Sequence, residues 1–286
     1  MSRPCAIWQN RAVPFIERAG TKIFYERRGR SGDTIVLLHN TFCDHRVFEG
    51  VAERLRKSFR LILVDFRGHG QSPMPAKYYT AEDLAVDVVS ILNEERVEKA
   101  LIVGVSIGAT VALELALGVP GRLAGIALLG ATARPNEGRD AARNSALAPL
   151  VRIFGVRGPI LALGMRTLFG GTFRDRSRRE KEARQAFAYW RGRIGGMSAK
   201  AAYASLRAWC RRPSYLGRLS GVTLPALVVA GEEDVACRLD EGAELARSMP
   251  RARLVRVPAG HMMAVEKPGD IAEALEEFAG SADFGR

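Results

Sequence analysis

Short runs of apolar residues alternate along the chain with helix-like stretches, and this alternation limits the possible folds more than any other feature. The apolar runs are TIVLLHN (34–40), FRLILVDF (59–66), KALIVGV (99–105), LAGIALLGA (123–131), LPALVVAG (224–231) and ARLVRVP (252–258). Continuous apolar runs of this length are typical of strands that are buried on both faces of a sheet. The helix-like stretches are 44–57, 80–96, 107–118, 238–248 and 268–279. The sequence therefore predicts an α/β fold with a mostly parallel, doubly wound sheet.

Two segments depart from this alternation. Residues 13–30 alternate weakly between apolar and polar and turn at Gly20, which predicts an opening antiparallel hairpin. Residues 135–215 are rich in Arg and Ala and contain no clear strand, which predicts a helical insertion over the carboxyl edge of the sheet. We therefore expect a core domain in two parts, 1–134 and 216–286, with a helical lid insertion at 135–215 between them.

The composition argues against several classes of protein. The sequence contains no stretch of about 18 apolar residues, so no membrane-spanning helix is predicted. The first residues lack the apolar run of about 7–15 residues that a secretory signal requires. The four cysteines are scattered, so we expect reduced thiols and a cytoplasmic location. The four histidines show no ligand spacing, so no metal site is expected.

The net charge of +12 lies in the insertion, because 135–215 holds 17 Lys and Arg against 5 Asp and Glu while the remainder is balanced. This charge could attract an acidic substrate or an anionic membrane surface, or it could simply face solvent. Nucleic-acid binding is not expected, because no basic motif interleaved with aromatic residues is present. Apolar residues of the insertion could line a pocket or pack against the core: Leu150, Ile153, Phe154, Leu163, Leu168, Phe169, Phe173, Phe187 and Trp190.

The pattern Gly104-Val105-Ser106-Ile107-Gly108 carries the strongest chemical signal in the chain. It stands directly between a predicted buried strand and a predicted helix, where Gly-x-Ser-x-Gly forms a nucleophile elbow. Glycines on either side leave room for the tight turn, and the positive end of the following helix favours developing negative charge. Ser106 is therefore the predicted nucleophile.

With this elbow, the chain resembles the α/β-hydrolase family over nearly its whole length. Further motifs of that family are LLHNTF (37–42), DFRGHGQSP (65–73), GEED (231–234) and GHMMAVEKP (260–268). In style it is closest to small lidded esterases, enol-lactonases and cofactor-free haloperoxidases. The resemblance implies Asp234 as the acid and His261 as the base, in the family's chain order. It further implies the backbone N–H groups of Thr41 and Ile107 as oxyanion donors, with no cofactor.

Some assignments around this triad remain open. Glu232, Glu233 and Asp240 lie close enough to the same strand end to rival Asp234 as the acid. Asn40 stands where the family commonly has glycine, and we expect it to adopt the left-handed conformation that Asn tolerates. The hydroxyl of Thr41 could also reach the pocket. Among the other histidines, we expect His39 and His69 to make structural hydrogen bonds near the site and His45 to be a surface residue at a helix start.

A serine nucleophile argues against epoxide hydrolases and haloalkane dehalogenases of this fold, which use aspartate at the elbow. We expect hydrolysis of a small carboxylic ester or lactone, possibly acidic, through an acyl-Ser106 intermediate. Alternatives with the same triad are C–C bond hydrolysis, peracid formation with haloperoxidase activity, and acyl transfer. A non-catalytic ligand receptor on the same scaffold is the alternative outside enzymes.

Overall fold

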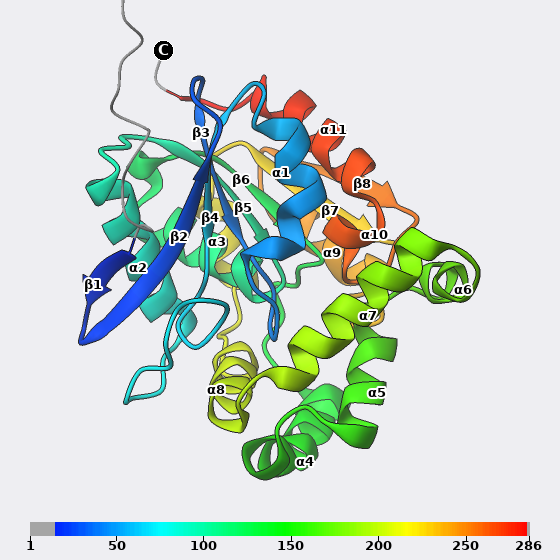
Figure 1. Cartoon of the computed structure of the whole chain (residues 1–286). Coiled ribbons are helices and arrows are strands. Elements are labelled where there is room, and N and C mark those ends of the chain that lie inside the picture. The colour runs from blue at the N-terminus through cyan, green and yellow to red at the C-terminus, as the bar shows by residue number, and fades with distance from the viewer. Residues whose placement is uncertain (1–14, 285–286) are drawn as a thin grey trace, which may run out of the picture.

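The computed structural model describes residues 15–284, except for the side chains at positions 139, 140 and 143. Within this range eight strands form one sheet in the order β1-β2-β4-β3-β5-β6-β7-β8 (Figure 1). The strands are β1 (Phe15–Arg18), β2 (Thr21–Arg28), β3 (Thr34–Leu38), β4 (Arg60–Val64), β5 (Ala100–Val105), β6 (Leu123–Leu129), β7 (Ala226–Gly231) and β8 (Ala252–Val257). β2 is antiparallel to β1 and β4, and the remaining neighbours are parallel. The predicted fold class is confirmed, as is the hairpin that turns at Gly20.

Helices cover both faces of this sheet. In the core they are η2 (His45–Phe48), α1 (Glu49–Leu55), α2 (Ala81–Glu94), α3 (Ile107–Gly118), η3 (Pro120–Arg122), η4 (Leu216–Gly221), α9 (Leu239–Arg247), α10 (Met263–Glu266) and α11 (Pro268–Ala279). Successive side chains of a strand point to opposite faces. Accordingly Ile35 and Leu37 of β3 belong to the same core cluster as residues of α1 and α11, whereas Val36 and Leu38 belong to the cluster that includes residues of α2, α3 and α9. Burial on both faces explains why the strands read as continuous apolar runs.

A helical insertion separates β6 from β7. It consists of α4 (Gly138–Phe154), α5 (Gly158–Leu168), α6 (Gly171–Arg179), α7 (Lys181–Gly196) and α8 (Ala199–Cys210), gathered at one end of the sheet (Figure 1). Its two ends meet, because Tyr215 N donates to Ala133 O at 2.9 Å and Arg212 Nε donates to Arg134 O at 2.9 Å. The insertion thus leaves and rejoins the core at one place. The boundaries at 135 and 215 stay a prediction.

The apolar residues of the insertion divide into two groups. Phe169, Phe173 and Trp190 are buried and belong to the same core cluster as α1 and α11. Ile153 and Phe154, at the end of α4, are 67% and 58% exposed.

Across residues 15–284, every helix is too short or too polar to cross a bilayer.

Candidate active site

Ser106 lies on a strained turn between β5 and α3. Its φ of 55° and ψ of −112° place a non-glycine residue in a region that costs about 1–3 kcal/mol. A Cβ on Gly104 would lie 2.1 Å from the carbonyl of Gly108, and one on Gly108 would lie 2.2 Å from the oxygen of Leu38. Both flanking positions therefore require glycine. Ile107 is the first residue of α3, where a backbone N–H has no acceptor within the helix.

Asp234 and His261 form a buried pair beyond the ends of β7 and β8. The Oδ2 atom of Asp234 lies 2.8 Å from Nδ1 of His261. The other carboxylate oxygen, Oδ1, accepts hydrogen bonds from Ala236 N at 2.8 Å and Cys237 N at 2.9 Å. One oxygen is thereby held by the loop while the second orients the imidazole.

The rival carboxylates are directed elsewhere. Glu232 and Asp240 are exposed, and Asp240 pairs with Arg238 at 3.3 Å. Glu233 accepts a hydrogen bond from Thr172 N at 2.8 Å. Of the four acidic residues that the sequence offered, Asp234 is the one that the structure places against His261.

The surroundings of His261 favour its protonated form. Burial by itself lowers the pKa of His261, but the charge and hydrogen bond of Asp234 and the charge of Glu266 raise that pKa above its ordinary value. An imidazole in this setting can accept a proton from a neighbouring hydroxyl and remain stable as the cation. The pair therefore suits a general base.

Gly130, just after β6, makes room for this pair and was missed by the sequence analysis. It has a φ of +52°, and a Cβ there would lie 2.9 Å from Oδ2 of Asp234 and 3.0 Å from Nδ1 of His261. Any side chain at this position would push the carboxylate or the imidazole aside. The sequence did show a glycine at the end of a predicted strand. The glycine is needed because Gly130 contacts Asp234 and His261, which lie more than 100 residues later in the sequence.

Ser106 and His261 open onto one cavity of about 160 Å³. Thr41 and Phe42 also line it, and most of the rest of its wall comes from the insertion. Apolar side chains of α4, α5 and α8 that contribute are Leu147, Val151, Ile160, Leu163, Leu168, Leu206 and Trp209. Among the described residues that line it, His261 is the one with an ionisable side chain. The positive charge of the insertion therefore does not reach this cavity through any described side chain.

The Thr41 amide belongs to a tight turn after β3. Cys43 N donates to Asn40 O at 3.2 Å, and Phe42 has a φ of 68°. A turn closed by this hydrogen bond, with positive φ at its third residue, has the features of a type II turn. The expectation that Asn40 takes the left-handed conformation is wrong, because the turn places that conformation two residues later, at Phe42.

Two polar side-chain atoms of this turn are buried, and one of them belongs to Thr41, which lines the same cavity as Ser106. Within the described part of the chain, Oδ1 of Asn40 and Oγ1 of Thr41 have no hydrogen-bond partner. A buried polar atom without a partner costs about 1–3 kcal/mol. A polar group of a ligand bound in the cavity could relieve that cost at Thr41.

His39 ties this turn to the adjacent loop. Its Nδ1 lies 2.8 Å from Asn40 O, and its Nε2 accepts a hydrogen bond from Phe66 N at 3.0 Å. The proton therefore sits on Nδ1, and burial lowers the pKa of His39, which keeps the ring neutral. His69 is similar: its Nε2 lies 2.9 Å from Oγ of Ser205, and burial, followed by the charge of His39, lowers its pKa to about 3. Both histidines make the expected structural hydrogen bonds.

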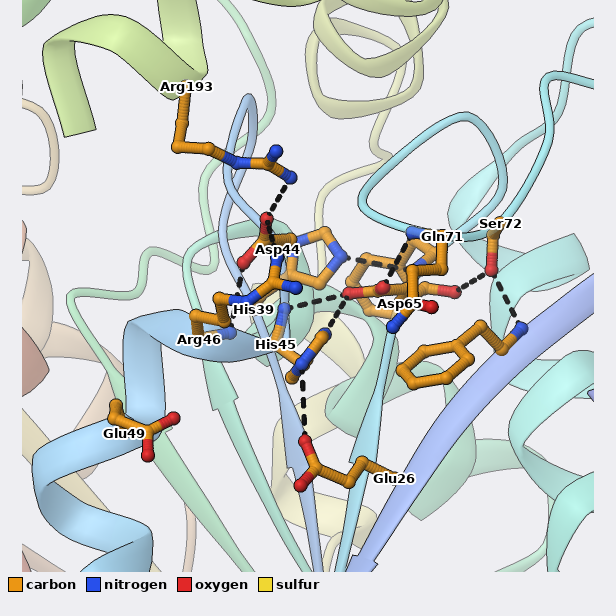
Figure 2. Close-up of polar contacts among 12 residues, drawn as sticks. Glu26, His39, Asp44, His45, Arg46, Glu49, Asp65, Gln71, Ser72 and Arg193 are labelled. Carbon is orange, nitrogen blue, oxygen red and sulfur yellow. Dashed lines mark hydrogen bonds and ion pairs between the residues drawn. The ribbon is translucent and has the colours of Figure 1, made fainter. Parts of the chain in front are cut away.

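A network of polar contacts connects the residues after this turn to β2 and to the end of β4 (Figure 2). Oδ1 of Asp65 lies 2.8 Å from both N and Nδ1 of His45, and Nε2 of His45 lies 3.2 Å from Glu26. His45 does begin a helix, η2, but it is only 2% exposed, so its prediction as a surface residue is wrong. The reason is that two carboxylates from β2 and the end of β4 enclose its ring. The second oxygen of Asp65 accepts from Gln71 N at 2.8 Å.

Asp44 links the same turn to the insertion. Its buried carboxylate pairs with Arg46 at 3.2 Å and with Arg193 of α7 (Figure 2). Asp44, His45 and Asp65 also form a group, among the described residues, whose ligand atoms lie within 4.8 Å of one another, as a metal site would require. The oxygens of Asp44 and Asp65 already accept hydrogen bonds from backbone N–H donors, and the ring of His45 is bonded to Asp65, so these hydrogen bonds account for the cluster.

Comparisons with known proteins identify the fold family of the chain. A family model described as the alpha/beta hydrolase fold matches residues 34–268. The chain is 26% identical to 3-oxoadipate enol-lactonase 2 of Acinetobacter baylyi over 216 residues, which are 76% of this chain and 77% of that protein. It is also 26% identical to the magnesium-chelatase 30 kDa subunit of Rhodobacter capsulatus over 249 residues, 81% of each. A thermophilic esterase from Thermogutta terrifontis matches with a TM-score of 0.84 at 25% identity, over 94% of this chain and 97% of that one.

Proposed function

The chain belongs to the α/β-hydrolase fold family, and on that premise we propose that it is a serine hydrolase that cleaves a small, uncharged carboxylic ester or lactone. One observation carries the proposal. Ser106, on its strained turn, shares a cavity with His261, whose Nδ1 is bonded to Asp234. An enol-lactonase and an esterase among the similar proteins support the same reaction class.

The reaction follows from the roles that these groups can take. Oγ of Ser106 attacks the carbonyl carbon while His261 accepts the hydroxyl proton, and Asp234 stabilises the resulting imidazolium. The amides of Thr41 and Ile107 donate to the oxyanion, and the imidazolium returns the proton to the leaving alcohol. Water, activated by the same histidine, then releases the acid from the acyl-Ser106 ester.

The cavity limits the substrate. In this proposal α4–α8 act as the lid, and the apolar side chains of α4, α5 and α8 hold the acyl or alcohol group. A cavity of roughly 150 Å³ accommodates a benzene ring, so 160 Å³ suits a group of about that size. The described lining residues include no Lys or Arg, so we propose an uncharged substrate rather than the acidic one that the sequence also allowed.

The test combines covalent labelling with turnover. A fluorophosphonate probe should label Ser106, and p-nitrophenyl esters of short acyl chains should be hydrolysed. Ser106→Ala should abolish both. Labelling that survives Ser106→Ala would contradict the assigned nucleophile.

The same experiment separates the alternatives. Labelling without hydrolysis of any ester or lactone would favour the receptor. Product formation only when hydrogen peroxide or a second alcohol is added would favour peracid formation or acyl transfer. Cleavage of a diketone in the absence of esterase activity would favour C–C bond hydrolysis.

A further inference from the structure

One short segment of the insertion contacts both loops that carry the histidine and its acid partner. This segment, residues 168–172, joins α5 to α6 and lies next to α10 (Figure 1). Met262 N, one residue after His261, donates to Leu168 O at 2.9 Å. Thr172 N donates to Glu233, one residue before Asp234, at 2.8 Å. The insertion is therefore bonded to the immediate neighbours of both residues of the pair.

Glu266 of α10 stands at the centre of these contacts. Its Oε1 accepts a hydrogen bond from Gly170 N at 3.2 Å, and its Oε2 accepts one from Gly260 N at 3.0 Å. The residue is only 6% exposed. A carboxylate is buried in this way only when N–H donors or cations compensate for lost hydration. The two donors come from the insertion and from the residue that precedes His261, so one side chain joins them.

The backbones of Gly170 and Gly260 touch. A Cβ on Gly170 would lie 2.8 Å from Glu233 Oε2, 2.9 Å from Gly260 N and 3.0 Å from Glu266 Oε2. A Cβ on Gly260 would lie 2.2 Å from Gly170 N. Contacts this close leave no space for a side chain on either glycine. The segment can therefore dock in this way only with glycine at both positions.

We propose that Glu266 is a positioning residue for His261: by bonding Gly170 and Gly260 together, it holds the histidine in register with the insertion. The inference rests on the proposed function, in which His261 is the base. Leu168, at one end of the docked segment, also lines the cavity. The segment 168–172 therefore forms part of the cavity wall and is also hydrogen-bonded to the loop that carries His261.

The charges around Glu266 affect its own pKa and the pKa of His261. Glu233, Asp234 and His261 face Glu266, and Arg174 of α6 donates to Gly170 O at 3.4 Å. Burial raises the pKa of Glu266, its two N–H donors lower it, and Glu233 and Asp234 raise it, so that it lies above the usual value. The negative charge of Glu266 in turn contributes to the raised pKa of His261.

Glu266→Gln keeps the shape of the side chain but removes its charge and leaves one oxygen for two N–H donors. We expect kcat on a p-nitrophenyl ester to fall about 10- to 100-fold through displacement of the base, with KM within about threefold of wild type. The pKa of His261, followed by NMR among only four histidines and assigned with His261→Ala, should fall. Loss of packing alone would not move that titration in this direction.

Gly170→Ala disturbs the same contact without changing charge. We expect a similar fall in kcat while the pKa of His261 falls less than in Glu266→Gln. Two matched controls should behave as wild type: Gly192→Ala, where an added Cβ meets nothing within 4 Å, and Glu276→Gln on the exposed face of α11.

Amide hydrogen exchange makes the test independent of turnover. Exchange in 168–172 and 259–262 should rise in Glu266→Gln and in Gly170→Ala. If wild type hydrolyses no ester and is not labelled at Ser106, the proposed function fails, while titration and exchange still decide the role of Glu266. If the Glu266→Gln protein had the same kcat, the same pKa of His261 and the same amide exchange as wild type, the inference would be overturned.

Discussion

An asparagine at position 234 could place its amide in two orientations, and the hydrogen bonds of the native residue allow the free-energy difference between them to be calculated. In the native protein Oδ1 accepts from two backbone N–H groups, and Oδ2 accepts from Nδ1 of His261. An asparagine side chain has a single oxygen, so it cannot serve both. Either the oxygen stays with the loop and the NH2 group faces His261, or the amide turns round.

The first orientation should win. Turning the amide leaves two buried N–H donors without an acceptor, at about 1–3 kcal/mol each, whereas in the first orientation the NH2 group donates to Nδ1 of His261 and each buried donor keeps an acceptor. The difference of about 2–6 kcal/mol favours the first orientation roughly 30- to 10⁴-fold. His261 must then carry its proton on Nε2, where it cannot accept one from Ser106. We expect kcat to fall about 10³- to 10⁴-fold, or about 4–5.5 kcal/mol of transition-state stabilisation.

The assay is turnover of a p-nitrophenyl ester at saturation, with thermal unfolding measured on the same samples. Asp240→Asn is the matched control, because Asp240 is an exposed carboxylate that the sequence alone allowed as the acid. Asp234→Asn should unfold close to the wild-type temperature and lose activity, and Asp240→Asn should keep its activity. A folded Asp234→Asn protein with more than a tenth of wild-type kcat would refute the reasoning.

Three further outcomes are expected. Because the pKa of His261 is raised and only the neutral imidazole can act as base, kcat/KM should fall on the acid side with a midpoint above the ordinary value of about 6.5; a midpoint below that value would contradict the assignment. Gly130→Ala should lower kcat at least about tenfold by displacing the Asp234–His261 pair, and a crystal structure with that pair unmoved would contradict the steric argument. Leu163→Ala, which widens the cavity, should move the preferred p-nitrophenyl ester to a longer acyl chain, whereas Leu150→Ala, elsewhere on the insertion, should not.

Much of the fold could be predicted because its signals are local. A strand buried on both faces must be apolar at successive positions, so the run 99–105 predicts β5 without knowledge of its neighbours. The turn at Ser106 is equally local, since the glycines that it requires stand two residues on either side. The helices α3 and α11 begin and end where their stretches, 107–118 and 268–279, indicated.

The two wrong expectations, for His45 and Asn40, have separate physical causes. His45 reads as a surface residue because its polarity is visible and the carboxylates that enclose it, Glu26 and Asp65, lie about 20 residues away on either side. The left-handed residue after β3 depends on which hydrogen bond closes the turn, so the residue type at Asn40 was a poor guide. The partners of His45 are brought close only by folding, whereas the turn is local and its hydrogen bond from Cys43 N to Asn40 O decides which neighbouring residue takes positive φ.

By itself, the sequence determined the mostly parallel α/β architecture, the tight Gly-x-Ser-x-Gly turn at Ser106 and the order of the chemical motifs, because these depend on residues adjacent in the chain. Tertiary structure alone decided that Asp234 faces His261, that Gly130 leaves space for them, and that the charged insertion presents an apolar wall to the cavity. It also brought Glu266 between Gly170 and Gly260. Distances between side chains on different strands and loops depend on packing, and no local pattern of residue types encodes them.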